Sequence, residues 1–163
     1  MAVFSSFYVV LKNRLLVSPA LTAALIAPAV IADHIICQRF RLGDPGDGGH
    51  VKNLLLGPML YMIPSSYEYA PMTENHGKGD GIIDIEVHTN YTNANLASMI
   101  SHVKLVDDIC VELMTGADGA GGSASWISPY GVRLRLTTMQ CDQLSLSELR
   151  TKIKVKAQLL PAV

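Results

Sequence analysis

The segment Arg150-Thr-Lys-Ile-Lys-Val-Lys-Ala-Gln-Leu-Leu160 is typical of a β-strand with two different faces. Apolar side chains alternate with polar ones, namely Ile153, Val155, Ala157 and Leu159 with Lys152, Lys154, Lys156 and Gln158. Successive side chains of a strand point to opposite faces, so one face is apolar and the other carries a row of lysines. The segment therefore predicts a strand that packs on a core and presents positive charge on its other side.

The same period of two recurs upstream, at Ile82–Thr89 and at Val132–Thr138. In the first of these segments, Asp84, Glu86 and His88 are expected on the solvent side of the sheet. Two helices are expected as well. Ser18 and Pro19 are a typical start for the first, and an apolar stripe is expected to form the buried face of the second: Leu96, Met99, Ile100 and Val103.

The remaining segments complete an expected α+β fold, in which one or two helices pack on a largely antiparallel sheet. The further predicted strands are Phe7–Leu11 with Arg14–Val17 (one strand or a hairpin), His34–Leu42, the second half of Leu54–Ile63, and Ile109–Thr115. Ser65–Gly81 is expected to be a long polar loop, and Ser145 with Glu148 to cap one short helical turn.

The composition indicates a single domain, residues 1–163, with apolar surface to spare. The chain is 49% hydrophobic and only 17% charged, with a mean hydropathy of +0.27. Such surface usually ends in a subunit interface or at a membrane. Leu15–Ala32 could in principle be a signal or membrane segment, but Pro19 and Pro28 favour a buried or interface helix. The predicted self-association residues are Leu21, Leu25, Ile26, Leu54, Leu55 and Leu56.

Positive charge is concentrated at both ends of the chain and negative charge in the middle, although the net charge is only −1. If the Val132 and Thr151 strands are neighbours, they form one basic patch, to which an earlier strand adds two arginines. The predicted anion-binding residues are Arg133, Arg135, Lys152, Lys154, Lys156, Arg39 and Arg41. The partner would be an anionic membrane surface, RNA or nucleoprotein, or the acidic region of a neighbouring copy. Alternatively, the lysines only protect a sheet edge against aggregation.

No catalytic signature, phosphate-binding loop or matched Cys/His spacing is present, so no enzyme, cofactor or metal site is expected. Cys37, Cys110 and Cys141 are odd in number and widely spaced, as expected for reduced thiols of a cytosolic or nuclear protein. The competing hypothesis is a small intracellular enzyme with a site built from His76, Asp80, Asp84 and His88.

Two segments resemble viral proteins. Tyr8-Val-Val-Leu-Lys-Asn-Arg-Leu-Leu-Val17 is similar to the first strand of bornavirus matrix proteins. Ile83-Asp-Ile-Glu-Val-His88, followed by the Asn93–Val103 helix, resembles the strand-then-helix core of matrix proteins from nonsegmented negative-strand RNA viruses. The resemblance implies a small oligomeric matrix protein that lines a viral envelope, binds anionic lipid and touches the nucleocapsid.

The sequence thus predicts a non-enzymatic, self-assembling structural protein, with a viral matrix or coat-layer protein as the leading interpretation. Its expected partner is itself, together with the anionic surface named above. Its expected location is the virion and the host cytoplasm, nucleus or inner membrane face. A capsid subunit that binds nucleic acid and a small His/Asp enzyme are the alternatives.

Overall fold

The computed structural model describes residues 3–37, 47–71, 77–91, 96–114, 131–145 and 147–160. The elements in chain order are α1 (Val3–Leu16), α2 (Pro19–Ala24), a 3-10 turn η1 (Ile31–His34), β1 (Ile35–Ile36), α3 (Asp47–Leu54), β2 (Met59–Pro71), β3 (Gly77–Asn90), α4 (Leu96–Met114), β4 (Gly131–Ser145) and β5 (Glu148–Leu160). The predicted α+β class with a mostly antiparallel sheet is confirmed.

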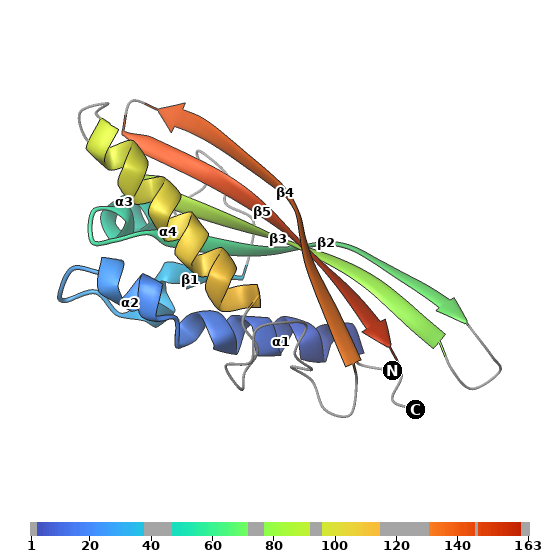
Figure 1. Cartoon of the computed structure of the whole chain (residues 1–163). Helices are drawn as coiled ribbons and strands as arrows, with labels where there is room; N and C mark the ends of the chain where they lie inside the picture. The colour runs from blue at the N-terminus through green and yellow to red at the C-terminus, as the bar shows by residue number, and fades with distance from the viewer. Residues whose placement is uncertain are drawn as a thin grey trace.

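The strands form one sheet in the order β1-β2-β3-β5-β4. Two long antiparallel hairpins, β2–β3 and β4–β5, join through the antiparallel pair β3–β5, and only the short β1 runs parallel to its neighbour. The long strands twist strongly across the molecule (Figure 1). The ladder of β2 is irregular between Pro64 and Ser66, as expected where a proline cannot donate a backbone hydrogen bond. The strands that contain Val132 and Thr151 are neighbours, so the condition for one basic patch on them is met at the level of the backbone.

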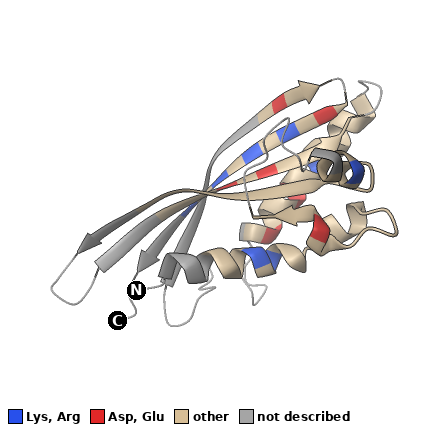
Figure 2. Ribbon diagram, turned by 180° about the vertical axis from the view of Figure 1, so that it is seen from behind, with Lys and Arg blue, Asp and Glu red and all other residues tan. Residues whose placement is uncertain are grey.

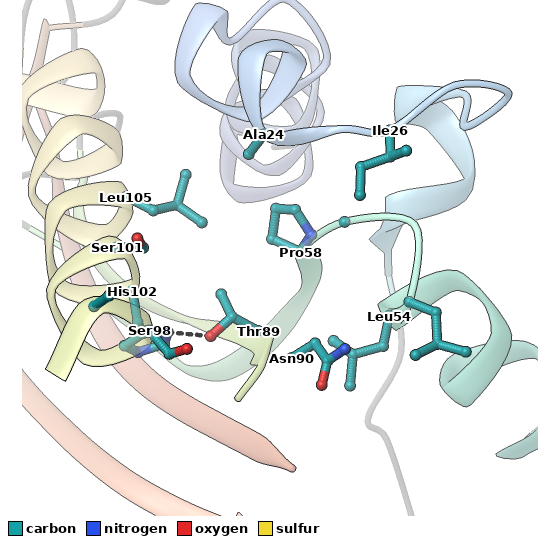
Figure 3. Close-up of a pocket in the computed structure, with 13 residues that line it drawn as sticks. Ala24, Ile26, Leu54, Pro58, Thr89, Asn90, Ser98, Ser101, His102 and Leu105 are labelled. Atoms are coloured by element: carbon teal, nitrogen blue, oxygen red, sulfur yellow. Dashed lines mark hydrogen bonds between the residues drawn. The ribbon is translucent and has the colours of Figure 1, made fainter. Parts of the chain in front are cut away.

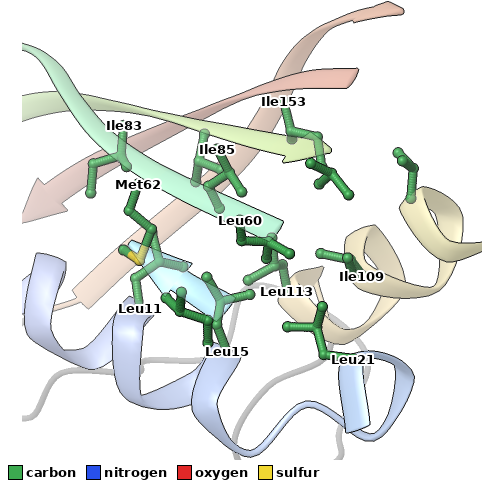
Figure 4. Packing of buried hydrophobic residues seen from close by; sticks show 14 of the residues in the cluster. Leu11, Leu15, Leu21, Leu60, Met62, Ile83, Ile85, Ile109, Leu113 and Ile153 are labelled. Atoms are coloured by element: carbon green, nitrogen blue, oxygen red, sulfur yellow. The ribbon is translucent and has the colours of Figure 1, made fainter. Parts of the chain in front are cut away.

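One face of the sheet forms the main hydrophobic core with α1, α2 and α4 (Figures 1 and 4). The alternating residues Ile83, Ile85 and Val87 of β3 are fully buried there, beside Ile153 and Val155 of β5. The apolar halves of the period-two patterns in β3 and β5 were therefore assigned to the correct side. Burial of each such side chain contributes roughly 1.5–3 kcal/mol to folding.

The helix α3 covers part of the opposite face. A second, smaller apolar cluster lies there, in which Leu54 at the end of α3 packs with Met59, Tyr61 and Ile63 of β2. These residues alternate along β2 with Leu60 and Met62, which point into the main core. Both faces of the sheet are thus covered at this end of the molecule.

The first segment of the chain is a helix, which corrects the prediction of a strand or hairpin for residues 7–17. Leu11 and Leu15, one turn apart, are completely buried, and the Tyr8 hydroxyl donates a hydrogen bond to the Met62 carbonyl at 2.8 Å. The β-branched Val9 and Val10 suggested a strand, but packing against the sheet outweighs this weak preference.

The predicted helix start at Ser18 and Pro19 is confirmed. The Ser18 side chain accepts a hydrogen bond from the Leu21 amide at 3.2 Å, and Pro19 occupies the first turn of α2. The carboxylate of Glu112, on α4, accepts a hydrogen bond from the Ser18 hydroxyl and another from the Ala20 amide at 2.8 Å. The helix ends at Ala24, before Pro28.

No helix in the described part of the chain is long and apolar enough to span a bilayer.

Four other assignments were wrong or incomplete. Strands β2 and β3 extend through much of the segment expected to be the polar loop of residues 65–81. The segment expected to be a strand at residues 109–115 continues α4 to Met114. Ser145 ends β4 and Glu148 begins β5, so they flank a hairpin turn rather than cap a helix. Of the strand predicted at residues 34–42, only Ile35–Ile36 is strand; residues 38–42 lie outside the described part.

Candidate functional site

A buried polar cluster lies between α3 and the sheet face that it covers. His50 comes from α3, Tyr61 from β2, Glu86 and His88 from β3, and Glu148 from the first position of β5. Residue exposures are 5% for His50, 3% for Tyr61, 8% for Glu86, 0% for His88 and 8% for Glu148. The expectation that Asp84, Glu86 and His88 face solvent is therefore wrong. They lie on the predicted side of the strand, but His50 of α3 packs against His88, and Lys152 of β5 lies against Asp84 and Glu86.

The cluster is a continuous hydrogen-bond chain centred on Glu148. Its Oε1 atom accepts from His50 Nε2 at 2.8 Å and from His88 Nδ1 at 2.6 Å. The other nitrogen of His50 bonds the Tyr61 hydroxyl, and His88 Nε2 bonds Glu86 Oε2 at 3.2 Å. One carboxylate therefore ties a helix to the central strand of the sheet.

Protonation follows from this geometry. Burial would raise the pKa of Glu148, but hydrogen bonds from His50 and His88 lower it to about 2. Burial would lower the pKa of His88, but its bonds to Glu148 and Glu86 raise it overall. The bond from His88 lowers the pKa of Glu86. His88 can donate to both carboxylates only as imidazolium, so the cluster stores a buried positive charge between two negative ones.

The lysine row lies next to this cluster and is partly neutralised by the chain itself. Lys152 Nζ lies 3.7 Å from Asp84 Oδ2 and 4.0 Å from Glu86 Oε1, on the neighbouring strand. Arg150 likewise pairs with Asp142 of β4 at 2.9 Å. The basic positions of β5 lie beside acidic positions on the two neighbouring strands, β3 and β4 (Figure 2). At least part of the positive charge is thus balanced within one copy.

The atoms of His50, His88 and Glu148 lie close enough to suggest a metal site, since one ligand atom of each falls within 4.8 Å of the others. A tetrahedral zinc ion with bonds of about 2.0–2.1 Å, however, separates its ligand atoms by about 3.3 Å. The observed separations of 2.6 and 2.8 Å are those of hydrogen bonds. His50, His88 and Glu148 are therefore placed as hydrogen-bond partners of one another rather than as ligands of a single ion.

The cluster predicts how stability depends on pH. Because the folded-state pKa values of Glu148 and Glu86 are lowered, their stabilisation is present above the unfolded value of about 4.3 and is lost as pH falls through the folded-state pKa, which for Glu148 is about 2. We expect the free energy of unfolding to fall steeply below about pH 4.5. Urea unfolding at a series of pH values measures this slope. In Glu148→Gln, which cannot titrate there, the slope should be shallower; an unchanged slope would rule out Glu148 as its source.

A pocket of about 400 Å³ lies between the start of α4 and the turns of the chain that follow α2 and α3 (Figure 3). Its apolar wall includes Ala24, Ile26 and Leu55, and its polar wall includes Thr89 and His102. His102 is buried between two hydroxyls, at 2.6 Å from Thr89 Oγ1 and 2.6 Å from Thr151 Oγ1. Burial lowers the pKa of His102 and favours its neutral form.

This pocket gathers segments that were predicted to mediate self-association. The Ile26 amide donates to the Leu56 carbonyl at 2.7 Å, so the segments around residues 25 and 55 lie side by side. Gly57 allows this approach, because its φ is +151° and a Cβ there would lie 2.7 Å from the Leu25 side chain. Ile26 and Leu55 are 59% and 62% exposed, while Leu21 and Leu54 are buried in the two cores. Ile26 and Leu55 are thus the more available for contacts between copies.

The helix α4 borders the pocket and is apolar on two sides. Its inner side chains Ile109 and Leu113 are completely or almost completely buried. On its outer side, Leu96, Ile100 and Val103 are 74%, 55% and 47% exposed. The first part of the helix was predicted correctly, but the stripe expected to face the core faces outward instead. The stripe was misassigned because α4 carries a second apolar stripe, and periodicity alone does not say which one packs inside.

The structure leaves several predicted site residues untested. Arg39, Arg41 and His76 lie outside the described residues, as do the side chains of Arg133, Arg135 and Asp80. Lys152, Lys154 and Lys156 lie on one strand, as predicted, but they are half-buried rather than fully exposed. His50 was not predicted as a site residue, because the glycine-rich sequence around it contains no recognisable motif. Its partner Glu148 lies far away in the sequence.

No protein-family model and no curated protein matches the chain. Among solved structures, a chain in "Virion of native gene transfer agent (GTA) particle" is similar to it, with 13% sequence identity and a TM-score of 0.49. The similarity covers 93% of this chain and 92% of that chain. A likeness of this size assigns neither a family nor a function. The resemblance to viral matrix proteins therefore stays a prediction.

Proposed function

We propose that the protein is a non-enzymatic subunit of a self-assembling structure, such as the coat or inner layer of a virus particle. The observation that carries the proposal is the exposed apolar stripe of α4, formed by Leu96, Ile100 and Val103. Exposed apolar side chains that lie together on one side of a helix commonly mark a contact with a protein partner, so the outer side of α4 is suited to one.

The exposed residues at the mouth of the pocket extend this surface. Ile26 and Leu55 lie beside the start of α4, from which the pocket is also lined by Ala97 and Ser98. The apolar stripe and the apolar pocket mouth therefore adjoin each other at one end of the molecule. Apolar residues scattered singly over a surface are ordinary, but adjoining ones mark interaction sites.

Binding to an anionic membrane or to RNA has less structural support than self-association. Lys152 already contacts two buried carboxylates, Asp84 and Glu86, in its own chain. An external anion would have to compete with these partners for the same ammonium group. We therefore base the proposed function on self-association and keep the anionic partner as a separate prediction.

Self-association is tested by sedimentation equilibrium of the whole chain from low to high micromolar concentration. The proposal predicts a mass above that of the 17.6 kDa monomer, rising with concentration. Moderate salt should change this little, because apolar contacts are not screened as exposed ion pairs are. A strictly monomeric protein at high micromolar concentration would contradict the proposal.

A further inference from the structure

We propose that the outer stripe of α4 packs antiparallel against the α4 of a second copy, about a two-fold axis close to Val103. This inference rests on the proposed self-association and adds to it the contact surface and the symmetry. Three properties of α4 support it. They are the spacing of the exposed apolar residues, the charged residues between and beside them, and the firm packing of the inner side of the helix in the main core.

The exposed apolar residues lie on both sides of the proposed axis. Leu96 and Ile100 precede Val103, while Val111, which is 64% exposed, follows it two turns later. In an antiparallel pair centred between residues 103 and 104, the Leu96 of each copy lies opposite the Val111 of the other. The two central valines meet near the axis. The apolar side chain at each end of the stripe is thereby covered by the side chain at the opposite end of the stripe of the other copy, as a two-fold interface requires.

The charged residues favour the antiparallel arrangement over the parallel one. Asp107 is exposed within the stripe, between Val103 and Val111, and Lys104 is exposed beside it. An antiparallel pair places each Lys104 within about one turn of the other copy's Asp107, whereas a parallel, in-register pair would stack like charges. The contact of Lys104 with Asp108 in its own helix, at 4.0 Å between two exposed side chains, is too weak to compete strongly.

The same charges disfavour a lipid surface as the occupant. Helices that lie on anionic membranes carry basic residues beside the apolar face. Here the exposed charges next to the stripe are Lys104, Asp107 and Asp108, two acids for one base. A second copy supplies both the apolar cover and the complementary charge.

The inner side of α4 provides the rigidity that a helix-to-helix contact needs. Ile109 and Leu113 are anchored in the main core, and His102 is held on both ring nitrogens by threonines. Glu112 also joins α4 to the start of α2. The outer stripe is therefore presented on a fixed helix, and association requires little ordering of the backbone.

Cysteine crosslinking tests this arrangement directly. In a background of Cys37→Ser and Cys141→Ser, which removes the two exposed native thiols, Val103→Cys should give a covalent dimer on mild oxidation or with a short bis-maleimide. A mixture of Leu96→Cys with Val111→Cys should give a mixed dimer in higher yield than either alone. Val9→Cys, on the exposed side of α1, is the matched control and should give little product.

The outcomes separate the two proposals. If the protein sediments as an oligomer but Val103→Cys crosslinks no better than Val9→Cys, the two-fold α4 contact is wrong and self-association by another surface stands. If Val103→Cys stays monomeric and the unmodified chain does too, both proposals are wrong. Efficient crosslinking at Val103, together with the mixed Leu96 and Val111 product, establishes the antiparallel pair.

Discussion

Replacement of Glu148 by alanine is expected to lower the free energy of unfolding by about 3–5 kcal/mol. The substitution removes the acceptor shared by His50 and His88 and leaves both imidazoles without their buried partner. The loss exceeds that of a surface ion pair because the groups left behind are desolvated and cannot recover their bonds from water. Urea unfolding at pH 6 measures it.

Two further variants make the interpretation specific. Asp108→Ala removes one partner of an exposed helix pair and should change the free energy of unfolding by less than about 0.5 kcal/mol. Glu148→Gln keeps the shape of the side chain and should fall between alanine and the natural residue. A Glu148→Ala protein as stable as Asp108→Ala would show that the buried network contributes little to the fold.

Replacement of Ile100 by aspartate is expected to weaken self-association by roughly two to four orders of magnitude. Burial of one isoleucine contributes roughly 1.5–3 kcal/mol, and a two-fold interface loses this contribution twice. The new carboxylate would also lie close to the other copy's Asp107 in the proposed register. The fold should be unaffected, because the Ile100 side chain is exposed in the single chain.

The matched control for this substitution is Val9→Asp. Val9 is 53% exposed on α1, similar to Ile100 on α4, but lies away from the stripe. An acid there should leave the association constant nearly unchanged. Equal weakening by the two substitutions would indicate a general effect of added negative charge rather than loss of a contact surface.

The strands with a sustained period-two pattern were predicted correctly, because alternation over several residues indicates a strand with one apolar side. This holds for β3, β4 and β5. Residues 7–17 were misread because Val9 and Val10 favour strands locally, while the helical spacing of Leu11 and Leu15 matters only once the sheet exists to cover them. Local preference is a weak guide where tertiary packing decides.

The candidate site was harder to predict, because it depends on contacts between distant segments. His50 and Glu148 meet only when α3 docks on the face opposite the main core. On that face α3 covers His88, and Lys152 of β5 lies against Asp84 and Glu86, so all three residues that a strand pattern assigns to solvent are buried. The apolar stripe of α4 was visible in the sequence, but only the structure shows that another stripe fills the core and that this one faces outward.

The central claim, self-association through α4, is tested most directly by sedimentation velocity of the unmodified chain and of Ile100→Asp, side by side over the same concentrations. The account predicts that the unmodified chain sediments as an oligomer. It predicts that Ile100→Asp sediments as a monomer with an unchanged thermal midpoint in dilute solution. Identical sedimentation of the two proteins, whether both are monomeric or both are assembled, would contradict it.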